Sequence, residues 1–460
     1  MTGVPAHRSP APAVRGGPDR RAIQLSALAV AALFLVIYLP DAGHGFISDD
    51  FRWIVEGRLA TPADLVRVFT SNVGFYRPVV TLSFGLDYAL WGDNARGYGV
   101  TNLALCLAGA WTLYVLARRL GLAPAASLVA AAAWLFNFHA VNMALLWLSG
   151  RTALLVTLFA LATAHAIAGG RTILAAAACF LALLSKEEAV ALPAFFTAAH
   201  LVEGGRMRGV ARLLPLWAAL GLYLALRWYS GAFWAGDAPS FYRFTVSPAL
   251  LLRNVAEYAD RAATVGAVVA IALVGATRVR RADLSPEEAR ALRFGALWIP
   301  AAFALTVALP VRSSLYALLP SIGTALVVGS IASAAQRAAP GRFARTALGL
   351  LVIVALLVPV YRSRNERWVG IAEVSARTMQ TVGEDTAGRP PGHIVLVDAP
   401  EERFNLASAF GNLFPEALRL RTAEGWTGEI VSSPAEAPAA AELVYRLENG
   451  GLSLVRRAGP

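Results

Sequence analysis

Two adjacent carboxylates, Asp49 and Asp50, follow closely on the first apolar run of the chain, which ends at Pro40. Neighbouring carboxylates repel each other, and the edge of a membrane is an unfavourable place to leave them unpaired. A carboxylate in such a position can take a proton from an attacking hydroxyl group. The stretch SDDFRWI therefore indicates either a solvated loop or the centre of a reaction.

Further polar side chains stand at the predicted outer ends of apolar segments, where a lone charge is costly, by about 2.5–3.5 kcal/mol at the centre of a helix and less near an interface. Arginine and lysine are suited to hold a phosphate group. Taken singly, Arg77 and Arg227 could reach lipid headgroups, and Lys186 and Glu187 could neutralise each other. As a set, together with the acidic pair, they favour one outer-face site, with these further members: Arg77, His139, Asn142, Arg151, Lys186, Glu187, Glu188, Arg227 and Arg312.

The composition indicates a membrane protein with many spans. Of the 460 residues 57% are hydrophobic and 15% charged, against roughly 25% charged in soluble domains, and the mean hydropathy is +0.55. Cys106 and Cys179 lie in apolar segments and indicate neither a disulfide framework nor a thiolate metal site. We predict eleven spans, at residues 22–40, 98–117, 123–138, 147–168, 172–185, 189–203, 211–228, 262–277, 294–310, 315–334 and 346–361.

Arginines gather in every second loop, as the positive-inside rule requires of cytoplasmic loops. The net charge of +11 therefore has a topological explanation, and no nucleic-acid partner is predicted. We expect a multi-pass protein of the bacterial cell (inner) membrane, with a cytoplasmic N-terminus. The acidic pair and the C-terminus then lie outside. An arginine- and alanine-rich, lysine-poor composition is typical of a GC-rich bacterium.

Three domains are predicted along the chain. Residues 1–21 form a basic cytoplasmic tail, and residues 22–361 form a transmembrane domain whose outer loop 41–97 carries the acidic pair. Residues 362–460 have a soluble-like composition and are predicted to form a small extracytoplasmic α/β domain. The fold class is thus an α-helical polytopic membrane protein with a C-terminal α/β domain.

Local patterns refine the two outer regions. Thr61 followed by Pro62 predicts the start of a short helix, and residues 77–92 predict a helix lying along the membrane surface. Residues 394–397 read as a buried strand, a helical stretch breaks near Pro415, and the Asn449-Gly450 pair predicts a hairpin.

The donor of any transferred group is predicted to be a lipid. No GxxxxGK[ST] loop is present to bind nucleotide phosphates. A carboxylate to accept a proton, basic groups to hold a phosphate and aromatic side chains to stack on a ring together suit transfer of a sugar from a phosphate carrier.

The ordered motifs resemble the GT-C superfamily of polyprenyl-phosphate-sugar glycosyltransferases, and most closely the protein O-mannosyltransferases with transmembrane helices and tetratricopeptide tails. The resemblance covers roughly residues 25–370. It departs from the family at Ala140, where the family has proline, in GYGVTNLALC, which lacks the family's histidine, and in the absence of the tail repeats. The matching blocks are SDDFRWI, FYRPVVTLSFGLDYALWG, GYGVTNLALC, LWLSGRTALL with His139 before it, LLSKEEAVALP, RSSLYALLPSIG and RNERW.

The resemblance implies a role for each matched residue. Asp49 would be the general base or orient the acceptor, and Asp50 would orient the acceptor or a divalent metal. Glu187 would brace Lys186, and His139 and Arg227 would support the site. No cofactor is predicted firmly, because a hard cation wants about six oxygen ligands and only these two carboxylates could offer any. The residues implied to bind the donor phosphate are Arg77, Arg151, Lys186 and Arg312.

The resemblance further implies transfer of a mannose-like hexose, with inversion, to a hydroxyl of a protein, glycan or lipid acceptor on the outer face. A transporter or flippase of lipid-linked glycans, an oligosaccharide ligase and a non-catalytic scaffold remain as alternatives. A transporter would more often place charged groups near the membrane midplane, on broken helices of two related halves, whereas a scaffold would tolerate Asp49→Asn.

Overall fold

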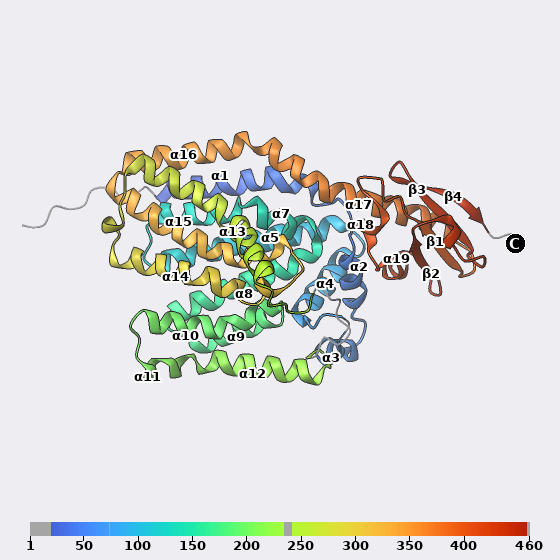
Figure 1. Ribbon diagram of the computed structural model, residues 1–460, viewed down its shortest axis with the longest axis horizontal. Helices are drawn as coiled ribbons and strands as arrows, with labels where there is room; N and C mark the ends of the chain where they lie inside the picture. The colour runs from blue at the N-terminus through green and yellow to red at the C-terminus, as the bar shows by residue number, and fades with distance from the viewer. Residues whose placement is uncertain (1–19, 73, 234–241, 458–460) are drawn as a thin grey trace, which may run out of the picture.

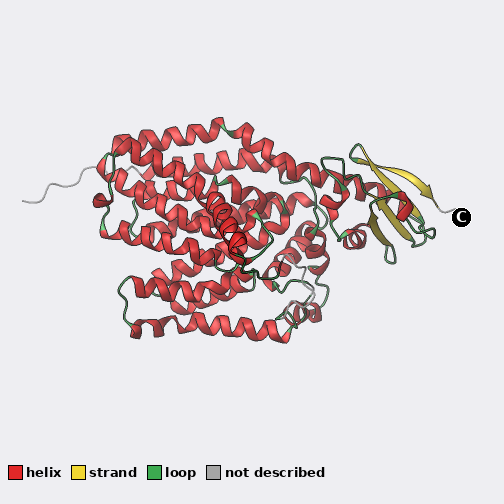
Figure 2. Cartoon of the chain, viewed as in Figure 1, coloured by secondary structure: helices red, strands yellow, loops and turns green. Residues whose placement is uncertain are grey.

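The computed structural model describes residues 20–72, 74–233 and 242–457. Helices dominate, and the strands of the described chain lie together at one end of the molecule (Figure 2). Residues 1–19 of the predicted basic tail, and residues 234–241 of the aromatic loop after Trp228, lie outside the described residues.

The helices form a bundle, with α17 leading out of it to the C-terminal domain (Figure 1). In chain order the α-helices are α1 (Arg20–Tyr38), α2 (Asp49–Glu56), α3 (Pro62–Thr70), α4 (Pro78–Trp91), α5 (Ala95–Arg119), α6 (Pro124–Leu135), α7 (Phe138–Leu146), α8 (Arg151–Ala168), α9 (Thr172–Leu183), α10 (Leu192–Val202), α11 (Met207–Val210), α12 (Leu214–Tyr229), α13 (Pro248–Thr277), α14 (Pro286–Phe303), α15 (Leu318–Ala338), α16 (Pro340–Leu356), α17 (Val358–Thr386), α18 (Leu406–Phe410) and α19 (Phe414–Arg421).

Six segments in the described chain are long and apolar enough to cross a membrane, and two sharply bent helix pairs raise the number to eight. Helical structure occupies most of every predicted span, but α9, α10 and α12 have 12, 11 and 16 residues. At 1.5 Å per residue they are about 16–24 Å long, shorter than a hydrocarbon core of about 30 Å. Eleven full-length spans are therefore not confirmed.

The loop that carries the acidic pair is built from three helices. Thr61 caps α3 through a reciprocal capping box with Asp64, as the Thr-Pro pattern predicts. The predicted surface helix is α4. Gly57 and Gly85 allow α2 and α4 to pack closely, because a Cβ atom at Gly57 would lie 2.8 Å from the Gly85 backbone nitrogen. This contact fixes the direction of the helix that begins with Asp49 and Asp50.

The C-terminal domain contains one four-stranded sheet, in the order β2-β1-β3-β4. Strand β1 runs parallel to both β2 and β3, and β4 pairs antiparallel with β3. The predicted strand and hairpin are confirmed, with Asn449 and Gly450 both at positive φ in the turn; β2 had no counterpart in the sequence prediction. The strands are β1 (His393–Val397), β2 (Thr427–Val431), β3 (Leu443–Glu448) and β4 (Gly451–Arg457).

The domain is joined to the bundle by α17 and by contacts with α2. The boundary predicted at residue 362 falls inside α17, which continues to Thr386. The Ser48 backbone N–H donates to the Ala409 carbonyl over 2.7 Å, and Phe51 stacks on Phe410 with ring centroids 5.6 Å apart. The start of α2 is thus held by the C-terminal domain.

Candidate functional site

Asp49 and Asp50 occupy the first turn of α2, where the partial positive charge of a helix N-terminus favours carboxylates. The residue before them, Ser48, has φ 48°, a conformation that is uncommon outside glycine. The backbone turns sharply there, and the two neighbouring side chains face different surroundings.

Asp50 is fully buried and holds the loop together. Its Oδ2 accepts the Ile47 N–H over 2.9 Å. Its Oδ1 accepts the Ser149 N–H over 2.6 Å and the Ser149 hydroxyl over 2.5 Å. Burial raises the pKa of Asp50 to about 7, although these hydrogen bonds favour the charged form. The implied role of orienting an acceptor or a metal does not fit, because both oxygens are already used within the protein.

Asp49 differs from its neighbour in both exposure and partners. It is half-buried, and its carboxylate makes no hydrogen bond or ion pair with the residues that the structure describes. Burial raises the pKa of Asp49, and the positive charges of Arg52 and Arg77 oppose that shift. A carboxylate with free acceptor oxygens and a raised pKa is a suitable general base.

Arg77 and Arg227 share one carboxylate, that of Glu187. Arg77 donates from Nε and Nη2 to Oε2 over 3.2 and 2.8 Å, and Arg227 donates from Nη1 to Oε1 over 3.3 Å. Burial alone would raise the pKa of Glu187, but the two guanidiniums hold it at about 2. The three residues come from the start of α4, from the 3₁₀ helix η3 (Glu187–Ala191) and from α12.

Lys186 pairs with Glu188 and not, as the resemblance implied, with Glu187. The Nζ atom lies 3.1 Å from Oε1 of Glu188, and both side chains are buried. The Nζ atom is itself buried, and among the described residues it has this ion pair but no hydrogen bond. Burial lowers the pKa of Lys186 and raises that of Glu188, while each charge opposes the shift of the other. The Tyr316 ring lies 4.8 Å from Nζ.

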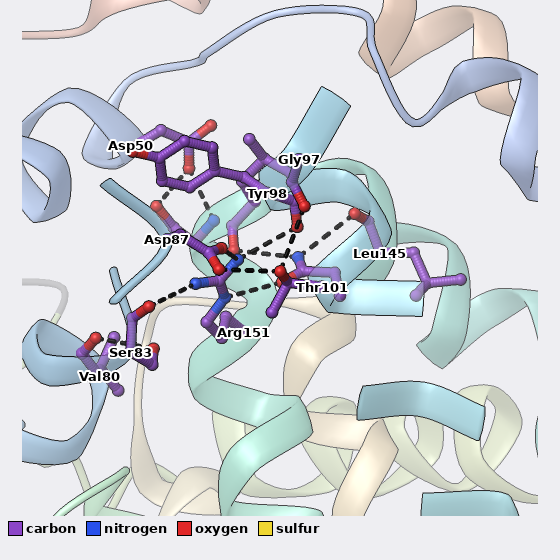
Figure 3. Close-up of polar contacts among 12 residues, drawn as sticks. Asp50, Val80, Ser83, Asp87, Gly97, Tyr98, Thr101, Leu145 and Arg151 are labelled. Carbon is purple, nitrogen blue, oxygen red and sulfur yellow. Dashed lines mark hydrogen bonds and ion pairs between the residues drawn. The ribbon is translucent and has the colours of Figure 1, made fainter. Parts of the chain in front are cut away.

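Arg151 has surroundings that do not suit the phosphate-binding role implied for it. It is fully buried. Its guanidinium donates to Asp87 over 2.5 Å, to Asn102 over 2.8 Å and to the carbonyls of Ser83 and Tyr98 (Figure 3). A prediction that Arg151 binds the donor phosphate does not fit, because its donors are used to join α4, α5 and α8.

His139 and Arg312 line a separate pocket of about 400 Å³. We call it the arginine pocket, because Arg261, Arg364 and Arg367 line it together with Arg312. The RNERW block matches the family pattern, but the sequence predicted no role for its two arginines or for Arg261. Their signal was their position at the ends of apolar segments, which also suits residues that contact headgroups.

The remaining predicted site residues therefore fall into two groups in the structure. We name the first group the Asp49 cluster; the second is the arginine pocket. No three His, Cys, Asp or Glu side chains come together to hold a metal ion in the described ranges. A divalent ion stays a prediction of the sequence. The Asp49 cluster consists of Asp49, Arg77, Lys186, Glu187, Glu188 and Arg227.

The fold resembles that of ArnT, a solved structure. The chain resembles the crystal structure of ArnT from Cupriavidus metallidurans in the apo state with a TM-score of 0.55 and 15% sequence identity, over 90% of this chain and 87% of that one. The structure of the same protein bound to undecaprenyl phosphate matches with a TM-score of 0.45 and 17% identity, over 79% of this chain and 72% of that one.

Among curated proteins, the chain is 33% identical over 121 residues to Protein O-mannosyl-transferase Tmtc1 of Drosophila melanogaster. It is 29% identical over 149 residues to Protein O-mannosyl-transferase F38B6.6 of Caenorhabditis elegans. These matches cover 24% and 29% of this chain and only 14% and 22% of the two relatives. No family model matches the chain. The resemblance to GT-C proteins of the O-mannosyltransferase type is confirmed in both sequence and fold.

Proposed function

We propose that the chain is an integral-membrane glycosyltransferase that moves a sugar from a polyprenyl phosphate to a hydroxyl group, with inversion at the anomeric carbon. The observation that carries this proposal is the contrast between the two adjacent acids. Asp50 is hydrogen-bonded within the protein, whereas the Asp49 carboxylate accepts no hydrogen bond from the described residues and lies under the electrostatic influence of Arg52 and Arg77.

The donor phosphate would bind between Arg77 and Lys186. Among the described residues, Nη1 of Arg77 makes no hydrogen bond, and Nζ of Lys186 has an ion pair with Glu188 but no hydrogen bond. The positive charge of Arg77 acts to lower the pKa of Lys186, and the proposed phosphate position lies between these two cations. ArnT, whose apo structure shares this fold, has also been crystallised with undecaprenyl phosphate, which supports a polyprenyl carrier.

The reaction would proceed by direct displacement. The acceptor oxygen attacks the anomeric carbon on the face opposite the phosphate, and Asp49 takes the hydroxyl proton. The bond between the anomeric carbon and the phosphate oxygen breaks, and its electron pair leaves with the polyprenyl phosphate. Arg77 and Lys186 would stabilise the charge that develops on this leaving group.

The sugar would be a mannose-like hexose, on the strength of the similarity to O-mannosyltransferases. Tyr316, beside Lys186, offers an aromatic face near the proposed phosphate position. The acceptor would be a protein, glycan or lipid on the outer face of a bacterial inner membrane, in contact with membrane lipids. The C-terminal domain would lie on that same outer side.

The test is release of polyprenyl phosphate by purified protein supplied in turn with undecaprenyl phosphate linked to mannose, glucose or arabinose. Asp49→Asn should slow release by about 100-fold or more, the usual contribution of a general base. Glu366→Gln, which neutralises an exposed carboxylate on α17, serves as the matched control and should behave as wild type.

Each other result has a distinct meaning. No release from any donor, or equal release by wild type and Asp49→Asn, would contradict the enzyme hypothesis. Movement of intact lipid-linked sugar across proteoliposomes without bond cleavage would favour the transporter, and transfer restricted to preassembled oligosaccharides would favour the ligase.

A further inference from the structure

The arginine pocket gathers four guanidinium groups from three parts of the chain. Arg261 lies on α13, Arg364 and Arg367 lie on α17, and Arg312 precedes the 3₁₀ helix η8 (Ser314–Ala317). Serine side chains at 313, 314 and 363 and the ring of Trp368 complete the wall. Its volume of about 400 Å³ lies within the range of small-molecule sites, about 300–1,000 Å³.

The positive charge of this pocket is not matched by carboxylates. Glu257 pairs with Arg312 and, over 3.4 Å, with Arg261. Asp260 accepts a hydrogen bond from Thr264 on its own helix, and its negative charge acts to favour the protonated form of His139. Arg364 and Arg367 form no ion pair in the described part of the chain and lie instead over the rings of Phe138 and Trp368.

The Asp49 cluster shows the opposite balance. Its three cations, Arg77, Arg227 and Lys186, stand against three carboxylates, those of Asp49, Glu187 and Glu188. The arginine pocket sets four guanidiniums against two carboxylates. Guanidinium groups bind phosphate oxygens in pairs of parallel hydrogen bonds, so the pocket is suited to an anion that brings more than one negative charge.

Two sets of contacts link the wall of the pocket to the proposed reaction site. Ser313 and Ser314 line the pocket, while Tyr316, two residues further, covers Lys186. Trp368 of the pocket wall stacks on Trp147 at 6.2 Å. The Trp147 indole N–H donates to the Ile47 carbonyl over 3.3 Å, three residues before Asp50. These contacts connect the wall of the pocket to the segment beside Lys186 and to the loop that carries Asp49.

We infer that the arginine pocket is the acceptor subsite and that the acceptor carries a phosphate group, such as a glycerol-phosphate headgroup or polymer. This inference rests on the proposed glycosyltransferase activity and adds the substrate class to it. The arginines would hold the phosphate of the acceptor, so that a hydroxyl on the same molecule reaches Asp49.

The first test is binding, which does not depend on turnover. Inorganic pyrophosphate is titrated calorimetrically into the purified full chain with and without saturating undecaprenyl phosphate. The two should bind together. The double variant Arg364→Gln/Arg367→Gln should weaken pyrophosphate binding at least about tenfold, because two charge-assisted contacts are lost, and should leave the affinity for undecaprenyl phosphate unchanged. Both arginines are exposed, so the fold should tolerate the change.

Arg377→Gln is the matched control, because Arg377 is exposed on the same helix and pairs only locally with Glu373. It should bind pyrophosphate as wild type does. The inference is overturned if pyrophosphate does not bind, if it binds the double variant equally well, or if undecaprenyl phosphate displaces it and loses affinity in the double variant, which would make the pocket the donor site.

The second test is transfer, with the active sugar donor and either soluble glycerol 1-phosphate or phosphatidylglycerol in nanodiscs as acceptor. The double variant should raise the acceptor KM about tenfold with little change in kcat, as expected when only binding is lost. The two acceptors distinguish a soluble from a lipid-borne phosphate; transfer to neither, with transfer to neutral glycosides instead, overturns the inference. If no donor releases polyprenyl phosphate at all, the proposed function fails, while the binding result still stands.

Discussion

Two arginine–carboxylate pairs at this end of the bundle differ in what surrounds them. Arg151 and Asp87 lie 2.5 Å apart with 0% and 3% of their side chains exposed, whereas Arg77 and Glu187 lie 2.8 Å apart with 14% and 30% exposed. In the first pair, Arg151 also donates hydrogen bonds to Asn102 and to backbone carbonyls. In the second pair, Nη1 of Arg77 makes no hydrogen bond to the described residues, and the charge of Arg77 acts on the Asp49 carboxylate.

The same contrast separates Asp50 from Asp49, although they are adjacent in the chain. A buried charge is tolerated when the protein satisfies it completely, and it then supports the fold. A charge that keeps a free donor or acceptor beside a partly exposed surface can serve a ligand. Residue type alone does not distinguish the two situations.

Arg151→Gln should damage the fold most. It leaves Asp87 buried without its cation, and breaking a buried pair in this way costs about 3–5 kcal/mol. The midpoint of thermal unfolding in detergent, with size-exclusion behaviour, measures the effect. The double variant Arg151→Met/Asp87→Leu should recover part of the loss, because no uncompensated charge remains. A wild-type melting curve for Arg151→Gln would show that the pair is not structural.

Arg77→Gln should affect donor binding rather than the fold. The expected loss is about 1.5–3 kcal/mol, the worth of a hydrogen bond to a charged group, seen as a raised dissociation constant for undecaprenyl phosphate. Glu187 keeps its contact with Arg227, so the unfolding midpoint should change little. Unchanged donor affinity together with lowered stability would place Arg77 with Arg151 instead.

Asp50 should make stability depend on pH in a defined direction. Its folded pKa of about 7 lies above the ordinary value of a carboxyl group, so the folded chain holds this proton more tightly than the unfolded chain. The resulting stabilisation is complete below about pH 4 and is lost as pH rises towards 7, with a slope of at most about 1.4 kcal/mol per pH unit. The melting midpoint of wild type minus that of Asp50→Asn should therefore fall between pH 5 and pH 8. A difference that stays constant or grows would refute this assignment.

Glu416→Gln should have the smallest effect. Its ion pair with Arg52 of α2 spans 3.9 Å, and both side chains are more than 20% exposed. Such pairs contribute about 0–1 kcal/mol. The melting midpoint and the release of polyprenyl phosphate should both stay near wild type. A large loss of activity would mean that the C-terminal domain controls Asp49 through Arg52.

Much of the fold follows from local patterns. The Thr61-Pro62 start of α3, the apolar strand β1 and the Asn449-Gly450 turn depend on neighbouring residues, and each appears where the sequence predicts it. The number of spans was less accessible. Hydropathy marks an apolar segment, but it does not tell that α9 and α10 stop short of a full membrane crossing or that α6 and α7 meet at a bend of 62°.

The site was predictable as a set of residue types and not as a set of contacts. The sequence singled out Lys186, Glu187 and Glu188 but paired Lys186 with Glu187. Its partner is Glu188, because the 3₁₀ turn at η3 directs consecutive side chains to different neighbours. Arg261, Arg364 and Arg367 come together only when α13 and α17 pack beside α7. Their separation in the chain hides that juxtaposition.

By itself, the sequence determined that this is a helical membrane protein with an acidic pair after its first span, basic groups at its loop ends and a small α/β domain. These are matters of composition, periodicity and motif order, which each segment carries alone. The tertiary structure decided which charged groups are fully hydrogen-bonded within the protein and which keep a donor or acceptor that the described residues do not use. Asp50 and Arg151 are satisfied by backbone and side chains from distant segments. Among the described residues, the Asp49 carboxylate and Nη1 of Arg77 make no hydrogen bond, because hydrogen-bond satisfaction depends on what packs around a residue.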